Sequence, residues 1–99
     1  MVQKARQFYP DDADIAKVLG ILSYRRQLYP RSVELLEEAA KRRRDDSELL
    51  YYLGVGLAQL KQWKECKAAM ERTLSLGRSP DLADKAKQTL IECSERGSP

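Results

Sequence analysis

Two apolar stripes at helical spacing occupy residues 47–76, which read SELLYYLGVGLAQLKQWKECKAAMERTLSL. The first stripe consists of Leu49, Leu50, Leu53 and Leu57, and the second of Ala69, Met70, Thr73 and Leu74. Both follow the i, i+3, i+4, i+7 spacing of an amphipathic helix and do not alternate as a strand would. The run Asp45-Asp46-Ser47 provides side-chain oxygens that can cap the first of these helices. The stretch therefore predicts two helices, near residues 47–60 and 63–76.

The same spacing extends in both directions from this stretch. It predicts helices near residues 13–27, 31–43 and 80–95, and a short one near residues 3–8. Pro30 separates the first two, because the residue before a proline avoids the helical region and proline suits the first turn of the next helix. Gly77 and the run Ser79-Pro80 separate the last two in the same way. The fold class expected is therefore all-α.

The pattern repeats with a period of 34 residues. Shifting residues 13–46 onto residues 47–80 places Leu19-Gly20 on Leu53-Gly54 and Tyr29 on Trp63. Identical residues are few, but large residues align with large ones and small residues with small ones. The break between the two helices falls at the same position of each unit. A fixed period of this length is typical of stacked helical repeats.

These features resemble the tetratricopeptide repeat, a 34-residue helix–turn–helix unit. The first unit carries the family pattern as Ala16-x2-Leu19-Gly20-x2-Ser23, then Ser32-x3-Leu36, then Ala39. The second unit carries it as Leu50-x2-Leu53-Gly54-x2-Leu57, then Cys66-x3-Met70, then Thr73. Both units depart from the pattern in lacking the aromatic residues of the first helix and the proline at position 32 of the unit.

The resemblance implies two repeats in a right-handed superhelical stack, with an N-terminal helix stub and a C-terminal capping helix. Residues 1–12 would be the tail of a preceding repeat, residues 13–46 and 47–80 the two repeats, residues 81–95 the capping helix, and residues 96–99 a disordered tail. The segment would belong to a longer protein of this family.

Small residues are expected where the two helices of each unit cross. Gly20 and Gly54 would let the second helix approach, with Ser32 and Cys66 as its small partners. We expect Cys66 to be a small buried side chain and not a reactive thiol. The two cysteines, Cys66 and Cys93, stand 27 positions apart and are too few for a zinc site or a disulfide scaffold.

The composition argues against catalysis. The chain has no His, so it lacks the commonest general base and the commonest neutral metal ligand. No Ser or Cys has an activating partner at an identifiable spacing. Gly54 and Gly56 begin a G-x-G pattern, but Gln stands where a third Gly would be needed. We expect no enzymatic activity, no cofactor and no bound metal.

The family binds extended peptides or partner helices in a groove lined by the first helix of each repeat. Transferred position by position, the resemblance implies a peptide-binding groove made of Lys17, Ile21, Tyr24, Arg25, Tyr51, Tyr52, Val55 and Gln59. Tyrosine gives a large contact area at low entropy cost, although some of these rings could simply cover the neighbouring helix. Ile21 and Tyr52 occupy positions that are Asn in the chaperone-binding subtype, so binding of chaperone tails is not expected.

The function expected is therefore a protein–protein interaction scaffold that binds a peptide or helix in the groove. The alternative is a set of structural spacer repeats in a larger protein with no groove ligand. A nucleic-acid-binding helical repeat is a weaker alternative, because the charge of +3 is small and the one basic run, at residues 41–44, is followed at once by Asp45 and Asp46.

The sequence leaves the partner, the process, the organism, the parent architecture and the oligomeric state open. A homodimer is possible through Phe8, Ile21 or Tyr24, since a segment cut from a stack exposes apolar surface. No apolar run reaches the length of a membrane span. The cytoplasm is weakly favoured for this segment, whereas the parent protein could be exported or anchored.

Overall fold

The computed structural model describes residues 13–97 and contains five helices in that range. They are α2 (Ala13–Arg25), α3 (Tyr29–Ala40), α4 (Ser47–Gln59), α5 (Trp63–Leu76) and α6 (Pro80–Arg96). No strand occurs within residues 13–97, which confirms the all-α class. The helix expected near residues 3–8 and the interface residue Phe8 lie outside the described residues. The helix expected near residues 13–27 ends two residues earlier, at Arg25. The helix expected near residues 31–43 begins two residues earlier, at Tyr29, and ends three residues earlier, at Ala40.

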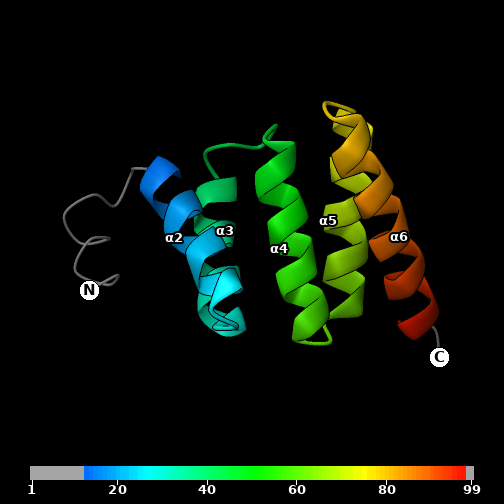
Figure 1. Ribbon diagram of the computed structural model, residues 1–99, viewed down its shortest axis with the longest axis horizontal. Coiled ribbons are helices and arrows are strands. Elements are labelled where there is room, and N and C mark those ends of the chain that lie inside the picture. Colours follow the sequence, from blue (N-terminus) through cyan, green and yellow to red (C-terminus); the bar gives the residue numbers. More distant parts are fainter. Residues whose placement is uncertain (1–12, 98–99) are drawn as a thin grey trace.

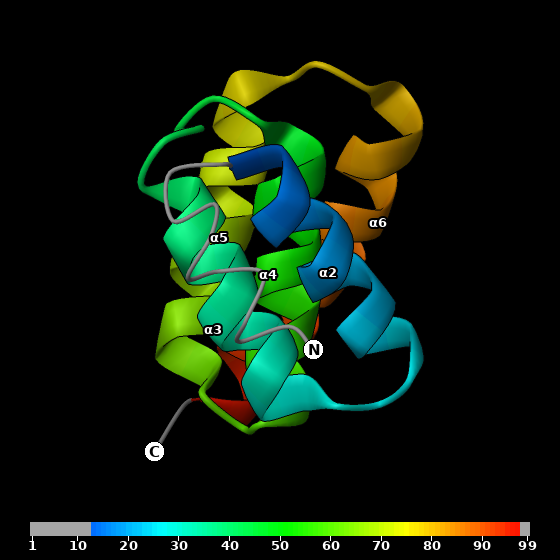
Figure 2. The ribbon, with the colours of Figure 1, turned by 90° about the vertical axis from the view of Figure 1, so that its left-hand side faces the viewer.

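The helices stack side by side in chain order, in two layers. Figure 1 shows α2, α4 and α6 in front of α3 and α5, and the turned view of Figure 2 separates the two layers. Each helix packs against the next one along the chain, and α4 also contacts α2 and α6 within its own layer. This is an all-α repeat stack. It gives the front layer one continuous face composed of every second helix.

The 34-residue period reappears in the backbone of the turns. Gln27 and Lys61, which stand 34 positions apart, both adopt the left-handed conformation, with φ of 64° and 61°. In the first turn the Leu28 amide donates to the Ser23 carbonyl at 2.8 Å, and in the second the Gln62 amide donates to the Leu57 carbonyl at 2.9 Å. The α2–α3 and α4–α5 hairpins thus close with the same hydrogen bond although their turn sequences differ.

Glycine lies where the helices of each hairpin cross. A Cβ atom on Gly20 would come 2.7 Å from Leu36 Cδ2, and one on Gly54 would come 3.3 Å from Ala69 Cβ and closer still to the Met70 methyl. Distances below 3.0 Å force a neighbour to move. Ser32 also lies at the first crossing, where its hydroxyl donates to the Gly20 carbonyl at 2.7 Å. The register expected for these glycines is therefore confirmed.

Side-chain and backbone caps fix the helix ends. Asp46 precedes α4, and its carboxylate accepts from the Leu49 amide at 3.1 Å. Ser79 precedes α6, and its hydroxyl accepts from the Leu82 amide at 3.4 Å. Gly77 ends α5 with φ of 56°, which a glycine adopts without a steric penalty. These are the positions at which the sequence predicts helix breaks.

Cys66 and Cys93 form a disulfide between α5 and α6, with their Cα atoms 6.4 Å apart. Both residues are fully buried. Burial of Cys66 was expected, but its bond to Cys93 was not; α6 folds back along α5 and brings Cys93 to it. The spacing of 27 residues gives no sign of this pairing, which depends on how the last helix docks.

Candidate functional site

Four tyrosines from α2, α4 and the start of α3 form a row, which we call the tyrosine row: Tyr29, Tyr24, Tyr52 and Tyr51. The ring centroids are 5.5 Å apart for Tyr29 and Tyr24, 5.8 Å for Tyr24 and Tyr52, and 5.7 Å for Tyr52 and Tyr51. The last two pairs meet edge to face at 72° and 75°, a geometry favoured by the aromatic quadrupole. All four residues are partly exposed. The row therefore connects α2 and the start of α3 with α4.

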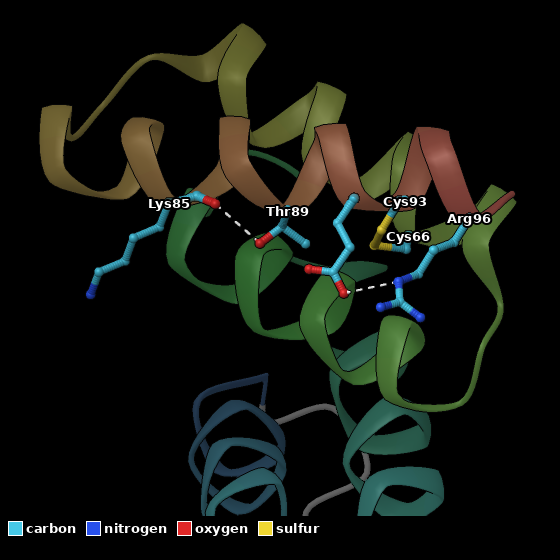
Figure 3. Close-up of a disulfide and its surroundings, with 6 residues drawn as sticks. Cys66, Lys85, Thr89, Cys93 and Arg96 are labelled. Atoms are coloured by element: carbon cyan, nitrogen blue, oxygen red, sulfur yellow. Dashed lines mark hydrogen bonds and ion pairs between the residues drawn. A yellow bond between two sulfur atoms is a disulfide. The ribbon is translucent and has the colours of Figure 1, made fainter.

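The row continues to α6 through Thr89, whose side chain interacts with the Tyr51 hydroxyl and partly offsets the rise that burial causes in the pKa of Tyr51. Thr89 Oγ1 also lies 3.0 Å from the Lys85 carbonyl of its own helix, to which it donates (Figure 3). All three helices of the front layer therefore contribute to one line of side chains. Tyr29 and Thr89 were not among the groove residues expected from the sequence. The 34-residue repeat could have identified Thr89, because a shift of 34 residues aligns Thr89 with Val55, which was an expected groove residue.

The hydroxyls of Tyr24 and Tyr51 keep their protons at neutral pH. Burial raises the pKa of Tyr24, and the neighbouring tyrosines Tyr29, Tyr51 and Tyr52 raise it further. Burial likewise raises the pKa of Tyr51, together with the charge of an ionised Tyr52. Tyr24 and Tyr51 therefore each offer a neutral hydroxyl, which can donate and accept a hydrogen bond.

The other expected groove residues fall into two groups. Ile21 is half-buried and packs against the hydrophobic core, and Val55 is buried in it. Arg25 and Gln59 lie at the C-terminal ends of α2 and α4 with exposed side chains. The surface open to a ligand is therefore polar and aromatic, because its aliphatic members are largely used in packing.

Lys17 is held in ion pairs inside the protein. Its ammonium group lies 2.8 Å from Asp46 Oδ2 and 3.0 Å from Glu48 Oε1, and its side chain is 18% exposed. Burial alone would lower the pKa of Lys17, but the hydrogen bonds to Asp46 and Glu48 outweigh it and raise that pKa. Lys17 therefore joins α2 to the start of α4 and has little capacity left for a ligand carboxylate.

Charged residues also surround a hollow at this end of the stack. It is lined by Lys17, Arg42, Arg43, Asp45, Asp46, Ser47, Glu48 and Arg78. Arg43 pairs with Asp14 and Asp46, and Arg78 lies 3.3 Å from Asp45 Oδ2. The basic run at residues 41–44 is thus partly neutralised by acidic neighbours, as expected for a solvated helix end. Among residues 13–97, no group of acidic or Cys residues is placed to hold a metal ion.

No protein-family model and no curated protein matches the sequence. Solved structures match it closely in three dimensions. The structure of MamA AMB-1 superposes with a TM-score of 0.86 at 23% identity, over 96% of this chain and 50% of that one. A MamA point mutant gives 0.85 at 23% identity over the same shares of the two chains. MamA MSR-1 gives 0.72 at 20% identity, over 97% and 63% of the respective chains.

MamA is a tetratricopeptide-repeat protein. The chain has a tetratricopeptide-repeat fold. The resemblance that the 34-residue pattern indicated is thereby confirmed at the level of the fold. The chain spans about half the length of the first MamA chains that it matches. Within the described part of the chain, no helix combines the length and the apolar character needed to cross a membrane.

Proposed function

We propose that this chain is a protein–protein interaction module that binds a peptide or a partner helix along the tyrosine row. The tetratricopeptide fold supports a role as an interaction scaffold at this general level. The observation that carries the finer proposal is the continuity of the row, which connects α2, α4 and α6 on one face. Aromatic side chains with a polar tip are enriched at protein interfaces because they combine apolar area with a hydrogen-bonding group.

The electrostatics of this face support an uncharged contact surface at its centre. Lys17, on the same helix as Tyr24, is neutralised by Asp46 and Glu48. Tyr24 and Tyr51 in the row carry neutral hydroxyls. Arg25 is exposed at the C-terminal end of α2, so it can contact an acidic residue at one end of a ligand. The proposed ligand is therefore a segment with apolar side chains and free backbone carbonyls that the tyrosine hydroxyls can bind.

Selection of peptides from a displayed random library on the immobilised chain tests this proposal. Peptides recovered on the native chain should bind the Tyr51→Ala/Tyr52→Ala variant at least about tenfold more weakly, the loss of roughly one interface hot spot. Arg25→Glu should weaken binding of acidic peptides. Arg31→Glu is the matched control, since Arg31 is also an exposed arginine but belongs to α3 in the other layer.

Circular dichroism of each variant shows whether it keeps the helical fold. A loss of binding is then not confused with unfolding. Selected peptides that bind the tyrosine variant unchanged would place the site elsewhere on the module. Failure to recover any peptide would favour the alternative of spacer repeats without a groove ligand.

We also propose that the chain acts in an oxidising compartment and not in the cytoplasm that the sequence weakly favoured. The buried pairing of Cys66 with Cys93 supports this, because disulfides persist in oxidising environments and are rare in the cytosol of most organisms. Alkylation of free thiols in intact cells before lysis, followed by mass spectrometry, tests it. A protein recovered with both cysteines alkylated would contradict the proposal.

A further inference from the structure

The last helix is attached to the stack by very few buried side chains. α6 has 17 residues, of which only Ala86 and Cys93 are buried. In contrast, α4 buries eight of its 13 residues, and α3 buries five of its 12. Leu82, Ala83 and Leu90 are only partly covered, and Ile91 is 59% exposed. A terminal helix with so little buried apolar surface is expected to open locally before the rest of the protein.

The disulfide lies in the C-terminal half of this helix (Figure 3). Near it, the Arg96 guanidinium lies 5.6 Å from the centre of the Trp63 ring, and a Cβ atom on Gly97 would come 2.9 Å from Trp63 Cβ. On the side facing α4, Thr89 reaches Tyr51. Apart from the one covalent bond, few buried side chains therefore hold Thr89 against the tyrosine row.

We propose that the Cys66–Cys93 disulfide is a redox latch that holds α6 on the stack. With the latch closed, α6 covers α5 and completes the front face at Thr89. With the latch open, α6 separates from α5 while α2–α5 remain folded. This inference concerns the attachment of α6 and stands whether or not the tyrosine row binds a peptide.

Closing the latch requires a disulfide-bearing oxidant such as glutathione disulfide or an oxidoreductase. One protein thiolate attacks that disulfide and forms a mixed disulfide, releasing one thiolate of the oxidant. The second protein thiolate then attacks the mixed disulfide and releases the other. The two cysteines lose two protons and two electrons, and the oxidant's disulfide is reduced to two thiols. A dithiol reverses both steps and is itself oxidised to a cyclic disulfide.

Hydrogen exchange read by mass spectrometry on the oxidised and the reduced wild-type chain tests the latch directly. The reduced form is prepared by unfolding in dithiothreitol and refolding in its presence. Reduction should speed exchange in α6 by about tenfold or more, whereas exchange in α4 should change by less than about twofold, as expected for local opening. The Cys66→Ala/Cys93→Ala variant should match the reduced chain in α6 and should not respond to dithiothreitol.

Two results would overturn the latch. If α6 exchanges at the same rate in both redox forms, its other contacts suffice to hold it. If exchange rises equally from α2 to α6, the bond stabilises the whole fold and not the last helix. Because the oxidised and reduced samples share one sequence, neither result depends on a substitution that could itself unfold the chain.

The burial of both sulfur-bearing residues adds a kinetic test. Cys66 is 0% exposed and Cys93 is 1% exposed, so a reductant can reach the bond only after α6 lifts. The rate of reduction by dithiothreitol should therefore rise with urea well below the concentration that unfolds α2–α5. A rate that stays flat over that range would show that the bond is reached without opening of α6, which contradicts the latch.

Discussion

Lys17 Nζ lies 2.8 Å from Asp46 Oδ2, and this ion pair connects the two helical hairpins. Asp46 has a second role, because its other carboxylate oxygen caps α4 through the Leu49 amide. The two side chains are 18% and 16% exposed, so the pair is screened less than a fully solvated one. One carboxylate therefore stabilises both the start of a helix and its contact with the preceding hairpin.

The ion pair predicts a pH-dependent stability. Burial alone would raise the pKa of Asp46, but the hydrogen bonds from Lys17 and Leu49 outweigh it and lower that pKa. The contribution of Asp46 is therefore present above its unfolded pKa of about 3.9 and is lost as the pH falls through the lower folded value. Lys17, whose pKa is raised, contributes fully below its unfolded pKa of about 10.4 and loses this contribution as the pH rises through the higher folded value.

Asp46→Asn separates the charge from the cap, because Asn is an equally good N-cap residue. At pH 7 the variant should lower the free energy of unfolding by about 0.5–1 kcal/mol, the scale of a partly solvated pair. The difference from wild type should shrink as the pH falls below about 3.9. Urea titrations across this range measure it. A difference that does not vary with pH would mean that the charge of Asp46 contributes nothing.

Gly54→Leu should overpack the crossing of α4 and α5. The Cβ atom alone already comes 3.3 Å from Ala69 Cβ and presses on the Met70 methyl. We expect the free energy of unfolding to fall by about 1–3 kcal/mol, as for other overpacked cores. Gln59→Leu is the control, because it adds the same side chain at an exposed position of the same helix. Equal melting temperatures for the two variants would contradict the assigned crossing.

Ser32→Ala should weaken the contact between α2 and α3. Ser32 is fully buried, and its hydroxyl donates to the Gly20 carbonyl at 2.7 Å. Losing one such hydrogen bond costs about 0.5–1.5 kcal/mol. Thr89→Ala is a useful comparison, since its hydroxyl bonds to Lys85 within the same helix at a more exposed site. Thermal melts should show a larger loss for Ser32→Ala than for Thr89→Ala.

The helices could be predicted because their determinants are local. Periodic leucines, the capping residues Asp46 and Ser79, and Gly77 specify where α4 to α6 begin and end. The crossing at Gly54 could also be predicted, because the 34-residue period aligns it with Gly20. These signals depend on spacing along the chain and not on how distant segments dock.

The disulfide could not be predicted, because it depends on the docking of α6. The shape of the tyrosine row could not be predicted either, because it depends on how α2 and the start of α3 pack against α4. Cys93 shows only the apolar spacing of its own helix, and nothing in that spacing indicates that it meets Cys66. Lys17 was expected in the groove, but Asp46, which precedes the next repeat helix, engages it. The groove assignment itself stays a prediction until a ligand is found.

Self-association through α2 would use different residues from those that the sequence suggested. The sequence pointed to Phe8, Ile21 and Tyr24; Phe8 lies outside the described residues, and the other two are partly buried against the core. On the same helix, Val18 is 55% exposed and Leu22 is 46% exposed, and they lie four positions apart on one side of α2. A homodimer formed through α2 should therefore use Val18 and Leu22, since exposed apolar pairs are what a second copy would cover.

Sedimentation of the purified chain over a concentration series measures the association. We expect the Val18→Ser/Leu22→Ser variant to remain monomeric at concentrations where the wild-type chain dimerises. Ile91→Ser is the matched control, because Ile91 is 59% exposed but lies on α6 at the other end of the stack. Loss of the dimer in the Ile91 variant alone would move the interface to α6, and a wild-type chain that stays monomeric throughout would reject the dimer.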